Sequence, residues 1–466
     1  MYEHLLLQDV IKNKELCRCF GINKQTFVED IFSNTRASLC ILRPEGFLQS
    51  TILSELYDYL EGINHPVIYI DLTVCPKVTT IQDFTDYLNT VINKHWVKYN
   101  ICIDQKNNTP HADPEQRLLQ LIQALYISQK KRCYFIVNGI DRPKNWLRNE
   151  AENYFQIQSL WTNILSKVTK GNNCVEKSIL VGMGRPGGYY VDGALNNYRL
   201  FSLSDCQLSN SFGFTGSDIQ NIEKTMKLNA LEIENINVWY GGYHFGESTL
   251  YNPASVLKYL ADIAKHRTIE AKKHNLDVSQ YIETIFYTSP LPKPYWDINL
   301  KDSYLIDIIL CEKIKPSLNG LFNKQILTIS FTETATYYAG IEKSGNIYEL
   351  LSILVNAGIL TLGDKDDKGQ YVVRIPNKEV SILLQSLWQQ KPNLYTFFKE
   401  NKLEKPFSSL TVTEKRLYLL KAMQNLIYDN KELLSLIGGM VSEEQKLDTA
   451  YELLQEQNLA KSVAFF

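Results

Sequence analysis

The chain has 466 residues, 44% of them hydrophobic, which is enough for about two to four globular domains with sizeable cores. The formal net charge is −2, so the binding of nucleic acid through bulk positive charge is excluded, although a local basic face is not. No apolar run approaches the roughly 18 residues of a membrane-spanning helix, and the first thirty residues lack a signal-peptide pattern.

The cysteine pattern favours a reducing compartment. The count is odd, nine, and Cys40 and Cys133 lie inside apolar runs, so buried reduced thiols are expected rather than a disulfide framework. Cys17 and Cys19 have no second Cys or His pair at zinc spacing, and no metal site is expected there. The predicted location is the cytoplasm.

Strands and helices are expected to alternate in the first half of the chain. One or two short helices are expected in 1–30, followed by strands at 38–42, 66–71, 133–137 and 178–182 and by helices at 51–61, 79–98, 115–129 and 150–169. This alternation is typical of an α/β fold with a parallel sheet covered on both faces. Because ligands bind beyond the carboxyl ends of such strands, the loop 43–51, Asp71, the turn 138–143 and the segment 182–188 are expected to gather there.

The second half is expected to be mainly helical. Helices around a Gly- and Tyr-rich insertion, 239–243, are expected between 215 and 285, and Pro292 and Pro294 indicate a boundary. The mixed pattern of 300–385 suits a winged-helix-like module. The predicted division is a helical segment 1–30, an α/β core 31–215, a helical lid region 216–295, a winged-helix-like module 296–385 and a helical tail 386–466.

The loop 43–51 stands where a nucleotide-binding loop is expected, between a strand and a helix. A working phosphate loop ends in Gly-Lys-Ser/Thr, in which the lysine reaches the outer phosphates and the hydroxyl contacts Mg²⁺. Here the glycine position is Leu48 and the lysine position is Gln49, while Ser50 and Thr51 keep the hydroxyl. The loop has the framework of a phosphate site without its cation.

Several short motifs follow one another in a recognisable order. The loop fits Arg-Pro-Arg-Arg-Phe-Gly-Lys-Ser at four positions, and Asp141 and Pro143 fit the end of Ile-Asp-Glu-Tyr-Asp-x-Pro. Further matches lie at 195–197 (Leu-Asn-Asn), 213–215 (Gly-Phe-Thr), 239–243 (Trp-Tyr-x-Gly-Tyr), 251–256 (Tyr-Asn-Pro-x-Ser-Val) and 375–380 (Ile-Pro-Asn-x-Glu-Val). Together they resemble the AAA-ATPase-like family, bacterial P-loop proteins that often carry a nuclease domain. The resemblance implies a P-loop NTPase-like sheet between helices.

The departures from the family pattern predict a degenerate member. A working site has an Asp for the Mg²⁺ shell and a Glu to activate water, and here these positions are Asn138 and Gly139. With the lysine also replaced, no catalytic residue, no bound metal, no ATP cofactor and no turnover are expected. The residues of the vestigial nucleotide site are predicted to be Arg43, Gly46, Gln49, Ser50, Thr51, Asn138, Asp141 and Arg185.

Each of these residues also has a structural interpretation. The loop either only joins strand to helix, with Phe47 in the core, or holds an anion on the first amides of the helix. Arg43 either neutralises a phosphate or pairs with Asp71 or Asp141. Asp141 is either a turn or cap residue or a leftover metal contact. Arg185 is either a γ-phosphate sensor or a surface arginine.

The nuclease domain of the longer relatives is not expected. The tripeptides 400–402 and 444–446 match Glu-x-Lys, but both lie in helix-like surroundings without a preceding strand. The predicted function is therefore a scaffold or adaptor for another protein, acting in the cytoplasm or as a host-directed factor of a bacterium, with no membrane partner. Two alternatives stay open: a residual ATPase, and a nucleic-acid binder that uses the winged-helix-like module with Lys313, Lys315 and Lys324.

Overall fold

The computed structural model describes residues 10–34, 38–76, 78–101, 113–143, 151–184, 197–284, 288–296, 304–335, 341, 345–388, 411, 414, 415 and 418. Contacts divide the chain into two compact units, Met1–Pro292 with Ile298–Val380, and Lys293–Asp297 with Ser381–Phe466. The sheet, the cavity and the polar network described here all belong to the first unit. Most of the predicted tail 386–466 lies outside the described residues, and the five-part division stays a prediction.

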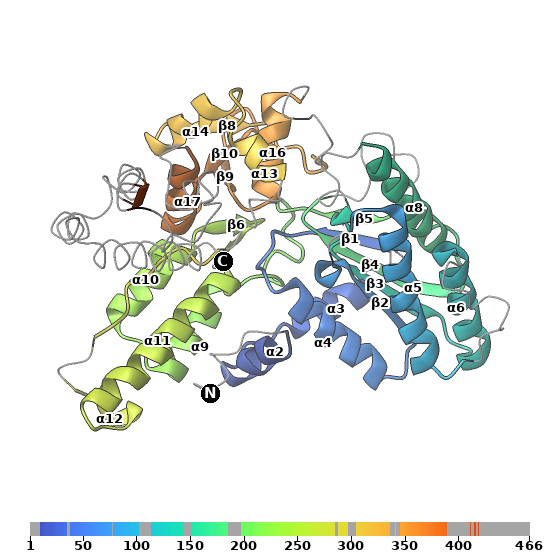
Figure 1. Cartoon of the computed structure of the whole chain (residues 1–466), viewed down its shortest axis with the longest axis horizontal. Helices are drawn as coiled ribbons and strands as arrows, with labels where there is room; N and C mark the ends of the chain where they lie inside the picture. Colours follow the sequence, from blue (N-terminus) through green and yellow to red (C-terminus); the bar gives the residue numbers. More distant parts are fainter. Residues whose placement is uncertain are drawn as a thin grey trace. The chain divides into compact units, whose positions relative to one another are not determined.

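The first unit contains a five-stranded parallel sheet with helices packed against it (Figure 1). Its order is β2-β3-β4-β1-β5, with pairs such as Leu39 with Ile179 and Asp71 with Asn138. The strands are β1 (Ser38–Leu42), β2 (Val67–Asp71), β3 (Cys133–Asn138), β4 (Val175–Gly182) and β5 (Arg199–Phe201). The predicted α/β class and the four predicted strands are confirmed. The short edge strand β5 was not predicted.

Apolar side chains on both faces of the strands explain why helices cover the sheet on both sides. One face of β2, β3 and β4 contributes side chains to a core that also contains Trp161 and is closed by α5 (Ile81–Lys98), α6 (Pro114–Gln129) and α8 (Ala151–Thr169). The helix α4 (Gln49–Gly62) contacts β2 and β3 and buries Ile52, Leu53, Leu56 and Leu60. These predicted helices are confirmed. Two shorter ones, α2 (Val10–Cys19) and α3 (Gln25–Ser33), fit the expectation for the first thirty residues.

Buried thiols occur in the strands, as expected. Cys40 and Cys133 are fully buried and unbridged, and burial raises the pKa of Cys133 to about 12. The other cysteines of the described ranges are free as well.

The region after the sheet is helical, as predicted, but it also contains a hairpin. The helices are α9 (Gly216–Met226), α10 (Ala230–Tyr240), α11 (Pro253–Lys273) and α12 (Val278–Ile282). The strands β6 (Tyr243–Phe245) and β7 (Ser248–Leu250) pair antiparallel between α10 and α11. Their turn requires Gly246, which has φ +52°, because a Cβ there would lie 2.4 Å from the carbonyl oxygen of Asp205.

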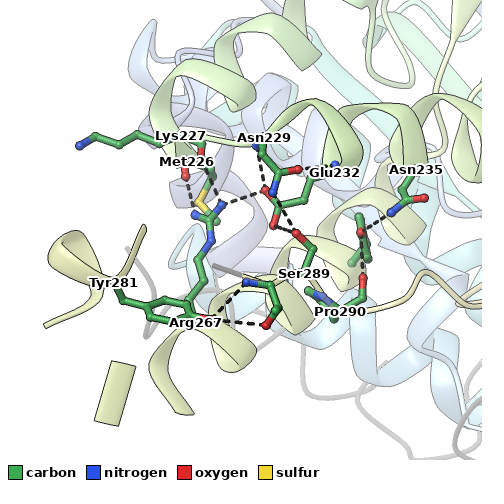
Figure 2. A network of polar contacts seen from close by, with 11 residues as sticks. Met226, Lys227, Asn229, Glu232, Asn235, Arg267, Tyr281, Ser289 and Pro290 are labelled. Atoms are coloured by element: carbon green, nitrogen blue, oxygen red, sulfur yellow. Dashed lines mark hydrogen bonds and ion pairs between the residues drawn. The ribbon is translucent and has the colours of Figure 1, made fainter. Parts of the chain in front are cut away.

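A fully buried ion pair ties these helices together (Figure 2). Arg267 of α11 donates to Oε2 of Glu232 in α10 at 2.9 Å and to the carbonyl oxygen of Met226 at 2.5 Å, at the end of α9. Glu232 also accepts from the hydroxyl of Ser289 at 3.2 Å, which connects the segment 288–290 to the helices. The network therefore joins the end of α9 and the first turn of α10 to the interior of α11 and to the segment 288–290.

The last part of the first unit carries a small antiparallel sheet with the order β8-β10-β9. Its elements are α13 (Tyr304–Ile309), α14 (Lys315–Phe322), β8 (Leu327–Ile329), α16 (Ile347–Asn356), β9 (Thr361–Lys365) and β10 (Tyr371–Arg374), and α17 (Lys378–Trp388) follows. Helices and strands alternate here as expected, and the winged-helix-like assignment stays a prediction. None of the described helices is long and apolar enough to cross a bilayer.

Candidate functional site

A cavity of about 200 Å³ lies at the carboxyl ends of β1, β3 and β4. It is lined by Glu45, Gly46, Gln49, Ser50, Thr73, Asn138, Gly139, Asp141, Arg142, Gly182 and Met183. The expected meeting of the loop 43–51, the turn 138–143 and the start of the segment 182–188 is therefore confirmed. Asp71 reaches this site through its bond with Asn138.

Asn138, at the position of the metal-binding Asp, bonds the hydroxyl of the loop and the carboxylate at the end of β2. Its nitrogen donates to the hydroxyl of Ser50 at 2.8 Å and to the carboxylate of Asp71 at 3.2 Å, and the residue is 2% exposed. Because a carboxylate only accepts, the nitrogen and not the oxygen of the amide faces Asp71. A phosphate-loop hydroxyl and an acidic strand end normally coordinate Mg²⁺. Here neutral N–H groups bond both oxygens.

Gly139, at the position of the catalytic base, is held in a conformation that favours glycine. Its φ is +74°, and a Cβ there would lie 2.9 Å from Cγ of Arg142 and 3.0 Å from Cγ2 of Thr73. Its N–H donates to the carbonyl oxygen of Val181 at 2.8 Å, which fixes the backbone against β4. A glutamate therefore does not fit at this position unless its neighbours move.

Asp141 lies in a turn, as expected, but its hydrogen bond crosses to another strand. Its Oδ1 accepts from the backbone N–H of Met183 at 3.0 Å, and the residue is 5% exposed. The expected bond to the amides that follow it is not what the structure shows. Gly182 is required beside it, because a Cβ there would lie 2.3 Å from the same oxygen. Asp141 thus links the ends of β3 and β4.

The charged groups of the cavity are two carboxylates and one guanidinium. Among its described lining residues, Arg142 is the single basic side chain, and its Nη2 already lies 2.5 Å from Oε1 of Glu45. Desolvation raises the pKa of Glu45, Arg142 opposes this, and the negative charge of Asp141 adds to it. The lining therefore carries an excess of negative charge at neutral pH, which disfavours a triphosphate.

The structure places Arg43 outside the cavity, contrary to its predicted role in a nucleotide site. It is fully buried, and it donates to the carbonyl oxygens of Leu42 at 2.6 Å, Ser202 at 3.0 Å and Leu208 at 2.9 Å. The alternative pairing with Asp71 or Asp141 is also wrong, because these carbonyl groups take its donors. Burial lowers the pKa of Arg43 to about 10. The residue anchors the chain segment that follows β5.

The loop joins β1 to α4 as a phosphate loop does, but the side chain at its lysine position bonds to the backbone of the loop. Gln49, at the lysine position, donates from Nε2 to the carbonyl oxygens of Arg43, at 3.1 Å, and Pro44. Leu48 has φ 64° and ψ 21°, the left-handed region that favours glycine, and its side chain does not cap α4. Thr51 is 4% exposed and does not line the cavity, which corrects its predicted place in the site.

Leu48 gives a test of this backbone geometry. Leu48→Ala and Leu48→Gly remove the same buried side chain, but only glycine adopts the left-handed region without strain. We expect Leu48→Gly to be more stable than Leu48→Ala by about 1 kcal/mol, measured by urea unfolding. At the exposed Lys94, inside α5, the same pair should show the reverse order by about 1 kcal/mol. The same order at both positions contradicts the left-handed geometry of Leu48.

The other side of the loop packs against the region that follows the sheet. Phe47 is fully buried, with its ring centroid 4.9 Å from that of Tyr243 and 5.1 Å from that of Phe245. A Cβ on Gly213 would lie 3.1 Å from the Phe47 ring. The carbonyl oxygen of Gly46 accepts from the N–H of Ala254 at 3.2 Å. Motifs 213–215, 239–243 and 251–256 thus all border the loop.

The motif 375–380 packs on the motif 239–243. A Cβ on Gly242 would lie 2.1 Å from the carbonyl oxygen of Pro376, and Asn377 donates from Nδ2 to the carbonyl oxygen of Gly241 at 2.9 Å. The glycines of the Trp-Tyr-Gly-Gly-Tyr stretch therefore allow the backbone of the motif 375–380 to approach closely. Arg185 and most of the motif 195–197 lie outside the described residues.

Comparisons with known proteins agree with the resemblance. Residues 45–185 match the AAA-ATPase-like family, described as predicted AAA-ATPase. An uncharacterized protein in the vnfD 5′ region of Azotobacter chroococcum mcd 1 is 22% identical over 364 residues, 77% of this chain and 60% of that protein. The chain thus spans about 60% of the length of this curated relative.

Solved structures of low similarity include Cdc6p from Pyrobaculum aerophilum, at 12% identity and a TM-score of 0.28 over 83% of this chain and 96% of that chain. The Orc1 protein of Aeropyrum pernix in complex with DNA has 9% identity and a TM-score of 0.29 over 79% and 91%. With scores this low, the fold assignment rests on the parallel sheet itself.

Proposed function

Given that residues 45–185 match the AAA-ATPase-like family, we propose that this chain is a catalytically degenerate member that acts as a scaffold or adaptor for another protein. We place it in the cytoplasm of a bacterium or in a host cell to which it is delivered. The observation that carries the proposal is Asn138, whose amide N–H groups bond Ser50 and Asp71 where a working site holds a metal.

The size and charge of the cavity support the loss of nucleotide chemistry. Its volume of about 200 Å³ is below the roughly 300–1,000 Å³ of ordinary ligand pockets. Gln49 turns its amide to the loop carbonyl groups, so no side chain at the lysine position faces a phosphate. Each lost electrostatic contact removes about 2–4 kcal/mol of transition-state stabilisation. The lysine, the metal ligand and the base are all replaced, so we expect no turnover.

A role in protein binding is supported by an exposed aromatic surface. Phe32 and Tyr59, 40% and 46% exposed, have ring centroids 5.7 Å apart, and the ring of the buried Tyr134 lies beneath them, 5.9 Å from that of Phe32. Ile63, 40% exposed, directly follows α4, the helix that contains Tyr59. The centres of protein interfaces are enriched in aromatic residues and depleted of charged ones.

The proposal predicts that partner binding does not depend on nucleotide. The tagged chain, used as bait in its native host, should retain the same partner with Mg²⁺ and ATP present and after an ATP-destroying enzyme is added. Phe32→Ser with Tyr59→Ser should reduce this capture, whereas Lys94→Ser, on an exposed face of α5, should not. Phosphate release by the purified native chain, or a partner held only in the presence of ATP, would overturn the proposal.

A further inference from the structure

Asp141 lines the cavity, and one oxygen of its carboxylate has no hydrogen-bond partner in the described part of the chain. The residue is 5% exposed and lines the cavity, and its Oδ1 accepts from the backbone of Met183. Within the described ranges nothing donates to Oδ2. A carboxylate oxygen that lines a cavity without a protein donor can still accept hydrogen bonds from a ligand. The free oxygen therefore favours a ligand that supplies hydrogen-bond donors and positive charge.

The cavity as a whole requires the same kind of ligand. Glu45 and Asp141 carry two negative charges, and Arg142 supplies one positive charge. Arg142 and Glu45 are 30% and 45% exposed at the side chain, so this ion pair is open to exchange with an incoming cation. The amino end of α4 contributes about half a positive charge, which does not cancel the excess.

We propose that this cavity binds an arginine side chain of the partner protein, with its guanidinium on Oδ2 of Asp141 and on the carboxylate of Glu45. This inference rests on the proposed scaffold function and names the chemistry of the partner. The planar fork of a guanidinium bonds two carboxylate oxygens at once, which an ammonium does not do. A cavity of about 200 Å³ suits one such side chain rather than a nucleotide.

The donor set favours an organic cation over a metal ion. The described residues contain no group of three or more Asp, Glu, His or Cys side chains that could hold a metal. Asn138 presents N–H groups, not a lone pair, toward Ser50 and Asp71. Mg²⁺ needs oxygen lone pairs in octahedral geometry, whereas a guanidinium needs only the two acceptors that Glu45 and Asp141 provide.

The titration of Glu45 gives a second readout of ligand binding. Its pKa is raised by desolvation and by the negative charge of Asp141. A guanidinium between the two carboxylates would lower it, so binding of the ligand should shift the titration of Glu45 to lower pH. A neutral ligand of the same shape would not do this.

The test uses two capped peptides, acetyl-Gly-Arg-Gly-amide and the same peptide with neutral citrulline, titrated into the full chain by NMR. The arginine peptide should shift the backbone resonances of Gly46, Gly139 and Gly182, and the citrulline peptide should not. Asp141→Asn and Glu45→Gln should each weaken binding at least tenfold. Arg142→Gln should strengthen it severalfold by freeing Glu45. Glu283→Gln, a matched change at an exposed carboxylate outside the cavity, should leave it unchanged.

Equal shifts with both peptides, binding that survives Asp141→Asn, or displacement of the peptide by Mg²⁺ alone would each overturn the inference. Glu45→Gln, at the rim, covers the case in which Asp141→Asn fails to fold. A parallel titration with ATP and Mg²⁺ distinguishes the failure of this inference from the failure of the proposed function. If neither arginine peptide nor nucleotide binds, this inference fails and the scaffold function stands. If the nucleotide binds in the cavity, the proposed function fails.

Discussion

Arg267→Ala is expected to lower the free energy of unfolding by about 3–5 kcal/mol, because it leaves the buried carboxylate of Glu232 without its counter-charge. Both side chains are fully buried, and their atoms lie 2.9 Å apart (Figure 2). The change also removes the donor to the carbonyl oxygen of Met226 at the end of α9. Unfolding in urea, followed by circular dichroism, measures the loss.

The matched control for this prediction is an exposed ion pair on the same helix. Lys273 lies 2.6 Å from Glu270, and its side chain is 64% exposed. Lys273→Ala should cost less than about 0.5 kcal/mol, because solvent screens such pairs. If Arg267→Ala costs no more than Lys273→Ala, the buried network does not hold the ends of α9 and α10.

The triple variant Leu48→Gly, Gln49→Lys, Asn138→Asp is expected to gain binding of ATP with Mg²⁺ by about 100-fold or more. Each restored contact to a charged group contributes about 1.5–3 kcal/mol, and every 1.4 kcal/mol is about tenfold in affinity. The lysine supplies the missing cation, and the new carboxylate replaces the amide that now bonds Ser50 and Asp71. Calorimetric titration measures the gain.

The same variant should not release phosphate, because Gly139 supplies no base and its backbone does not accept a glutamate. A control variant with Gln49→Met in place of Gln49→Lys has a side chain of similar length without the charge, and it should bind more weakly than the triple variant. Turnover by the triple variant, or equal affinity of the two variants, would contradict the roles assigned to Gly139 and Gln49.

The sequence predicts the central sheet well because its strands carry apolar residues on both faces and its helices one apolar stripe. The strand β5 was missed because it has three residues, of which Arg199 is exposed. The hairpin β6–β7 was missed for a different reason. Its glycines are required by contacts with Asp205 and Pro376, which are distant in sequence.

The sequence predicts where the candidate site lies and which charged residues it has lost. It does not predict the hydrogen bonds within the site. Asn138 was identified as a replaced acidic residue, yet only the structure shows its amide between Ser50 and Asp71. The role of Arg43 could not be predicted, because its acceptors are backbone carbonyl groups that carry no sequence signature. A phosphate-binding interpretation was the natural one for an arginine beside such a loop.

The packing of Phe47 fixes the loop from the side that faces away from the cavity. One side of the loop lines the cavity, and the other side inserts Phe47 among Tyr243, Phe245 and Gly213. The loop is therefore fixed by contacts with the region that follows the sheet. Its backbone geometry has a structural role that does not require the chemistry of a phosphate site.

The most direct test of this account is a calorimetric titration of ATP and Mg²⁺ into the native chain, with the triple variant as the positive control. We expect no binding to the native chain at nucleotide concentrations that saturate the variant. Saturable binding to the native chain that is lost in Ser50→Ala would show that the cavity still holds a nucleotide, and would contradict it.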